Sequence, residues 1–224
     1  PMLTQIVQSL PHVCSSLYES QMFSAAFLSA FFGFMRIGEF TTNSRSHTQP
    51  SVITDSDVEF SQNDSVVLLP YKRSKNNQSG PPQSICLQQS DNVQICPVAA
   101  LRAYAQVRPQ NAGPYFCHFD CTPLTRYQFT AVLKKVLAFN DMPADRIRGH
   151  SFRIGAASTA YSMGVPKDNI QYRVAGGPMQ WPRTSDLYRV LPGQVYSHCI
   201  IIHQKTKKVN GLASGAFDDI FTAP

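Results

Sequence analysis

The segment His150–Ala160 constrains the fold of this chain most strongly. It places an imidazole at His150 and a guanidinium at Arg153 within a run of small and apolar residues that favours a helix. Residues three positions apart lie on one face of a helix, so both groups are predicted to emerge together. The small residues at 155–157 would let the helix pack closely and hold the pair rigidly. Such a pair can bind one phosphate, although the same spacing is also typical of an exposed face or a structural ion pair.

The composition indicates a folded domain with an excess of positive charge. With 224 residues, of which 43% are hydrophobic, the chain can bury a core as one large domain or two small ones. Its formal net charge is +6 although only 15% of its residues are charged, which favours a polyanionic partner. We find no apolar run of membrane-spanning length and no signal-peptide pattern, so we expect no membrane partner. Because residue 1 is proline, we expect a fragment or a processed chain.

The six cysteines do not follow the spacing of a secreted disulfide framework. We therefore expect reduced thiols and an intracellular location. The segment Cys117–Cys121 contains two thiols and the imidazole of His118, which together suggest a metal site. No second pair of ligands follows at a suitable distance, so we predict no zinc site and no other metal.

Helical periodicity dominates residues 1 to about 40. An apolar pattern begins at Leu3 and leads into a second apolar segment, 22–35, which we predict to be a buried helix. Arg36 and Glu39 would close this helix and place a cation and a carboxylate three positions apart. One interpretation of that pair is structural, with the cation near the negative end of the helix and a local ion pair.

Two strands are predicted at 58–60 and 66–69 around a turn, and a returning strand at 85–87. They would form a small antiparallel sheet. The basic segment that follows the second strand contains Lys72 and Lys75. It is either an exposed turn or a hairpin that brings a lysine into a phosphate site.

Further helices are predicted at 98–107, 126–137 and 150–163, with a short extended piece at 115–116. Pro97 starts the first of these helices, and Arg108 with the following proline ends it. Gly164 ends the last one, with a proline shortly beyond. The predicted fold is mainly α with a small antiparallel β-sheet, an α+β arrangement in a single domain.

Five short motifs in order resemble the catalytic domain of the tyrosine recombinase (phage integrase) family, and most closely its branch in eukaryotic mobile elements of the Crypton or DIRS-like kind. The resemblance covers residues 20–170 well, and it is carried by Arg36–Glu39, Ser74–Asn76, Cys96–Val98, Pro123–Arg126 and His150–Ala157. It implies a recombinase catalytic domain over 1–196 and a C-terminal tail over 197–224. The N-terminal core-binding domain of such enzymes is expected to be absent from these 224 residues.

The resemblance also implies a mechanism. In this family a tyrosine attacks a DNA phosphodiester, forms a 3′-phosphotyrosyl bond and releases a 5′-hydroxyl, and a second 5′-hydroxyl later reverses the step. The bond energy stays in the covalent intermediate, so no cofactor and no metal is expected. Arg36, His150 and Arg153 match the residues that neutralise the charge developing on phosphorus. Lys75 matches the lysine that protonates the leaving oxygen, with Lys72 as its alternative. Glu39 matches the supporting carboxylate that orients the first arginine.

The remaining matches lie near the C-terminus, where the family pattern is followed loosely. Trp181 corresponds to the indole of the phosphate site, or it is a core residue. Tyr188 is the first candidate for the nucleophile and Tyr196 is the second.

The resemblance implies double-stranded DNA as the partner, a homo-oligomer in the form of a synaptic tetramer on that DNA, and a nuclear location in a eukaryote. The expected function is DNA strand cleavage and rejoining in site-specific recombination or integration of a mobile element. One alternative is a catalytically inactive DNA-binding relic with an altered or missing nucleophile. A second alternative is an unrelated helical interaction domain.

Overall fold

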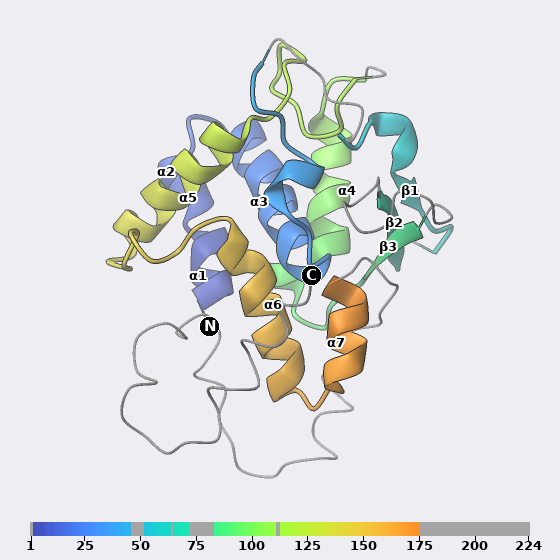
Figure 1. Cartoon of the computed structure of the whole chain (residues 1–224). Coiled ribbons are helices and arrows are strands. Elements are labelled where there is room, and N and C mark those ends of the chain that lie inside the picture. The colour runs from blue at the N-terminus through green and yellow to red at the C-terminus, as the bar shows by residue number, and fades with distance from the viewer. Residues whose placement is uncertain (1, 46–51, 64, 72–82, 111–112, 175–224) are drawn as a thin grey trace.

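The computed structural model describes residues 2–45, 52–63, 65–71, 83–110 and 113–174 (Figure 1). This part of the chain is mainly helical, with a small antiparallel sheet, which confirms the predicted fold class. The α-helices are α1 (Met2–Gln8), α2 (Leu10–Val13), α3 (Leu17–Phe32), α4 (Pro97–Val107), α5 (Arg126–Phe139), α6 (His150–Ser162) and α7 (Lys167–Val174). Three short 3-10 helices are η1 (Ile37–Glu39), η2 (Asp55–Asp57) and η3 (Val93–Ile95), and the strands are β1 (Glu59–Phe60), β2 (Val66–Tyr71) and β3 (Gln83–Gln88).

Helix α3 runs through the centre of the fold and is packed by α4 and α6 (Figure 1). Most of its residues between 22 and 31 are buried, on every side of the helix. A helix that is apolar all round must be covered on all faces, which explains why the other helices gather around it. Among the described residues, no helix has the length and hydropathy that crossing a membrane would require.

The end of α3 differs from the prediction. The helix stops at Phe32 and is not closed by Arg36 and Glu39, which lie beyond it as the N-cap and the last residue of η1. The N–H of Phe34 donates to the carbonyl of Phe31 (3.1 Å) and that of Met35 to the carbonyl of Ala30 (3.0 Å). This pair of bonds is a Schellman motif, with Phe34 at φ 53 in a position that glycine usually occupies. The sequence did not reveal the stop because a buried phenylalanine is rarely found in this conformation.

The sheet has the strand order β1-β2-β3, and both pairs are antiparallel, as predicted. Val67 pairs with Leu87 and Leu69 with Ile85, and all four side chains are buried. The sheet therefore turns one face toward the core, as alternation along a strand requires. Lys72 and Lys75 follow β2 but lie outside the described residues.

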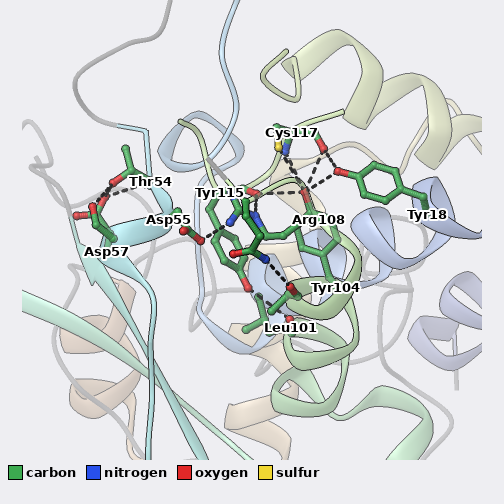
Figure 2. A network of polar contacts seen from close by, with 12 residues as sticks. Tyr18, Thr54, Asp55, Asp57, Leu101, Tyr104, Arg108, Tyr115 and Cys117 are labelled. Carbon is green, nitrogen blue, oxygen red and sulfur yellow. Dashed lines mark hydrogen bonds and ion pairs between the residues drawn. The ribbon is translucent and has the colours of Figure 1, made fainter. Parts of the chain in front are cut away.

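A buried polar network joins α3, α4 and the segment 113–117 (Figure 2). The Tyr104 hydroxyl donates to the carbonyl oxygen of Cys117 (3.0 Å) and accepts a hydrogen bond from the backbone N–H of Cys117 (3.0 Å). The Tyr18 hydroxyl donates to the same carbonyl (2.6 Å). Burial raises the pKa of Tyr18 to about 12 and raises the pKa of Tyr104 and Tyr115 further. These phenols stay protonated, and their hydroxyls form hydrogen bonds within the core. We therefore do not consider them as nucleophiles.

Arg108, at the end of α4, is anchored in the same region. Its Nε donates to the carbonyl oxygen of Tyr115 (3.2 Å), and its guanidinium lies 5.0 Å from the centre of the Tyr115 ring. Nη1 forms an ion pair with Asp55 of η2. The Arg108 side chain is only 1% exposed, so water does not solvate its positive charge. The Asp55 carboxylate stabilises that charge instead.

Asp55→Asn is expected to lower the free energy of unfolding by about 2 to 3 kcal/mol, because it leaves the buried Arg108 charge without its counter-charge. The value lies toward the low end for buried pairs because Asp55 is 39% exposed. Urea denaturation at neutral pH measures it. Asp145→Asn removes the carboxylate of the exposed Asp145–Arg146 pair and is the control, with an expected change of about 0.5 kcal/mol or less. Equal effects of the two substitutions would contradict the assignment.

Candidate functional site

Three phenylalanines fix the start of α6 in the core. Phe152 of α6 lies 5.1 Å from Phe27 of α3 and 5.6 Å from Phe129 of α5, measured between ring centroids. Phe152 stands between His150 and Arg153 in the chain, so burying its ring determines which way the first turn of α6 faces. Arg153 is 1% exposed and His150 is exposed at the first position of the helix.

The second half of the site is the turn η1. The backbone N–H of Arg36 donates to Oε2 of Glu39 (2.9 Å), and Nη1 of Arg36 lies 3.5 Å from Oε1 of the same carboxylate. The Arg36 side chain is 51% exposed and the Glu39 side chain 16%. Glu39 thus closes the turn as a cap and also holds the guanidinium, while Arg36 keeps much of its surface open to a ligand.

The two halves meet where Gly149 packs against Ile37. A Cβ atom on Gly149 would overlap Cδ1 of Ile37 and lie 2.5 Å from its Cγ1. Gly149 directly precedes His150, and Ile37 directly follows Arg36. The absence of a side chain at 149 therefore lets the start of α6 approach the η1 turn closely.

Electrostatics links all four predicted groups. Burial raises the pKa of Glu39, while the charges of Arg153 and Arg36 and the hydrogen bond from the Arg36 backbone oppose the rise. His150 is exposed, but the protein around the ring removes enough water to lower its pKa, and the charges of Arg153 and Arg36 lower it further. The charges of both arginines thus act on Glu39 and on His150, although the arginines are more than one hundred residues apart in the chain.

The arrangement suits an anionic ligand. The charges of two guanidinium groups act on one carboxylate, Glu39, whose pKa burial raises. The N-terminal end of α6 adds the positive end of a helix dipole on the same side. A phosphate that contacted Arg36 and His150 would relieve the repulsion between the cations. The site therefore combines two arginines, one histidine and one carboxylate, Glu39, among the described residues.

Four predicted site residues are brought together, namely Arg36, Glu39, His150 and Arg153. The others, Lys72, Lys75, Trp181, Tyr188 and Tyr196, lie outside the described residues. Among the described residues, no group of three His, Cys, Asp or Glu is arranged to hold a metal ion, and the cysteines at 14, 86, 96, 117 and 121 form no disulfide bond.

Two features of the site were not predicted from the sequence. One is the contact between Ile37 and Gly149, and the other is Arg126, whose guanidinium lies against Gly38 in the η1 turn. The signal for Arg126 was its place in the motif Pro123–Arg126. No local pattern signals that Gly149 and Ile37 touch.

No protein-family model matches the sequence, and no curated protein matches it. Among solved structures, the fold is similar to that of the XerH site-specific recombinase bound to difH substrate in a pre-cleavage complex, with a TM-score of 0.56 at 13% sequence identity. The chain has a recombinase fold. The match covers 77% of this chain and 44% of the XerH chain, so it spans less than half of that recombinase. The proposed relation to Crypton or DIRS-like elements stays a prediction.

Gly149→Ala is expected to lower the free energy of unfolding by about 1 to 3 kcal/mol, because the added Cβ overlaps Ile37. Ile37→Ala removes both overlapped atoms, so the double variant should recover most of this loss. Thermal or urea denaturation of the two single variants and the double variant gives the coupling energy, expected to be about 1 kcal/mol or more.

Gly164→Ala is the matched control for this cycle. Gly164 has φ 78 but no atom within 4 Å of an added Cβ, so its substitution strains the backbone without touching Ile37. Its cost should be unchanged by Ile37→Ala. Additive effects of Gly149→Ala and Ile37→Ala would show that the two segments do not meet as described.

Proposed function

We propose that the protein cleaves and rejoins DNA strands through a 3′-phosphotyrosyl intermediate, as a recombinase of a mobile element. The observation that carries the proposal is the joint electrostatic influence of Arg36 and Arg153 on Glu39 and His150, within a fold similar to that of a DNA-bound recombinase. Double-stranded DNA is the proposed partner, bound by a synaptic tetramer, and a nuclear location follows if the host is eukaryotic.

In this proposal, Arg36 and Arg153 donate to the two non-bridging oxygens of the reacting phosphodiester. A planar guanidinium stays charged and matches two oxygens, which a lysine does not. Glu39 does not react. It holds Arg36 through the cap and the ion pair, so that the guanidinium is oriented before DNA arrives.

The chemical step exchanges one phosphate ester for another. The phenolic oxygen of Tyr188, or of Tyr196, forms a bond to phosphorus as the bond to the 5′-oxygen breaks. The phenol releases its proton to water, and the 5′-oxygen takes one proton from the ammonium group of Lys75, with Lys72 as its alternative. His150 and the two arginines bear the negative charge that grows on the phosphoryl oxygens, and each such fixed donor can contribute about 2 to 4 kcal/mol. No cofactor is needed, because the ester bond is conserved.

The second candidate is a DNA-binding relic that keeps the arginine pocket without turnover. It is favoured by one feature of the sequence, the loose match of the segment around Trp181 and Tyr188 to the family pattern. A suicide substrate separates the two candidates. The probe is a pool of nicked duplexes of random sequence, and covalent protein–DNA adducts are detected on denaturing gels.

An active enzyme is expected to leave an adduct that Tyr188→Phe abolishes and that Arg36→Ala slows by about 100-fold. Arg36 is suitable because its side chain is half exposed, so its loss leaves the core intact. If Tyr196→Phe abolishes the adduct instead, Tyr196 is the nucleophile. Binding that weakens with salt but leaves no adduct identifies the relic. A protein that neither forms an adduct nor binds DNA would contradict both candidates.

DNA binding is expected to strengthen as the pH falls below neutrality. In the free protein, burial and the two arginines lower the pKa of His150, so its imidazole is neutral at pH 7. A bound phosphate stabilises the charged imidazolium and raises this pKa. Between the two pKa values binding takes up a proton, and the affinity therefore rises on acidification.

Fluorescence anisotropy with a labelled duplex at constant ionic strength measures this dependence. His150→Gln should remove it, whereas His12→Gln should keep it, because His12 is an exposed residue of α2 that stacks on Phe139. The same slope in all three proteins would exclude His150 as the group that takes up the proton.

A further inference from the structure

Arg126 is a third arginine at the candidate site, supplied by a different element. It is the first residue of α5 and is exposed. Its Nη2 lies 2.6 Å from the position that a Cβ atom on Gly38 would occupy. The guanidinium therefore rests on the backbone of the η1 turn, between Arg36 and Glu39 in the chain. A side chain at 38 would displace it.

The position of Arg126 relative to Arg36 is fixed by backbone contacts. Its N–H donates to the carbonyl oxygen of Thr42 (2.8 Å), and the N–H of Thr42 donates to the carbonyl oxygen of Leu124 (3.0 Å). Thr125 caps α5 by accepting from the N–H of Gln128 (3.2 Å). The start of α5 is thus joined to the strand-like segment that follows η1, so the two arginines belong to one rigid unit.

Among the described residues, this unit carries two arginines, Arg36 and Arg126, and one carboxylate, Glu39. Glu39 is paired with Arg36, and its pKa is raised by burial. Among the described residues, no carboxylate forms an ion pair with Arg126. Holding several cations on one unit costs free energy that a polyanion with several neighbouring charges would recover. A single phosphate has too few oxygens to serve all the donors, whereas a DNA strand offers the next phosphate along.

We propose that Arg126 binds a phosphate of the DNA backbone next to the one held by Arg36, His150 and Arg153. This inference rests on the proposed function, since it takes DNA as the ligand. Its contact is to the backbone, so it strengthens binding without choosing the sequence. The glycine at 38 has a role in the same contact, because it leaves room for the guanidinium on the turn.

The salt dependence of DNA binding tests the proposal. The affinity of the 224-residue protein for a labelled duplex is measured by anisotropy at several salt concentrations. Arg126→Ala is expected to reduce the slope of log K against log salt by about one and to weaken binding equally for duplexes of different sequence. Arg126→Lys keeps the charge and should keep the slope. Thermal denaturation of each variant shows that it is folded.

Two variants serve as controls. Lys135→Ala removes a positive charge from the same helix, α5. The Lys135 charge acts on Cys14, which is not part of the candidate site, so its loss should leave the slope unchanged. Gly38→Ala removes no charge but displaces the Arg126 guanidinium, so it should weaken binding in the direction of Arg126→Ala. This second variant gives an answer even if Arg126→Ala fails to fold.

The outcomes distinguish this inference from the proposed function. If Arg36→Ala lowers the slope while Arg126→Ala and Gly38→Ala behave like Lys135→Ala, the role of Arg126 is wrong and the phosphate site stands. If Arg126→Ala changes the preference between sequences instead of the slope, Arg126 contacts bases and the proposal is overturned. If the wild-type protein binds no DNA, both fail.

Discussion

The packing of Phe129 holds the structure together at the point where the candidate site forms. Its ring lies 4.8 Å from Phe27, 5.6 Å from Phe40 and 5.6 Å from Phe152, measured between centroids. These partners belong to α3, to the residue after η1 and to α6. One buried ring of α5 therefore sets the distance between the Arg36 turn and the His150 helix, and such aromatic contacts tolerate little displacement. The charged residues are positioned by an apolar contact beneath them.

The site holds its charges against their own repulsion. Arg153 is buried, and Glu39 is buried enough for its pKa to rise. The charges of Arg36 and Arg153 lower the pKa of His150. Apolar residues at the same positions would be at least as stable, so the buried charges do not add to the stability of the fold. In the proposed function, the cations are held together before a phosphate binds. Such preorganisation is what stabilises a charged transition state.

Much of the fold was predictable from local patterns. The α6 helix, its stop at Gly164 and the three-stranded antiparallel sheet follow from periodicity and turn chemistry, and the structure confirms them. The end of α3 was predicted wrongly, because Phe34 adopts a left-handed conformation that its own identity disfavours. Tertiary burial of that ring outweighs the local preference. The roles of Lys75, Trp181 and Tyr188 stay predictions, as these residues lie outside the described part of the chain.

The sequence by itself determined that His150 and Arg153 share one face of α6, because three-residue spacing fixes that locally. It also indicated that Arg36 and Glu39 are neighbours, but it placed them at the end of α3, whereas the structure has them at η1. Only the tertiary structure decided that these two pairs meet and that Arg126 joins them. Their meeting depends on the contact of Gly149 with Ile37 and on rings that pack around Phe129. Contacts between residues so far apart in the chain produce no periodic pattern in the sequence, because they depend on how the shapes of the side chains fit together.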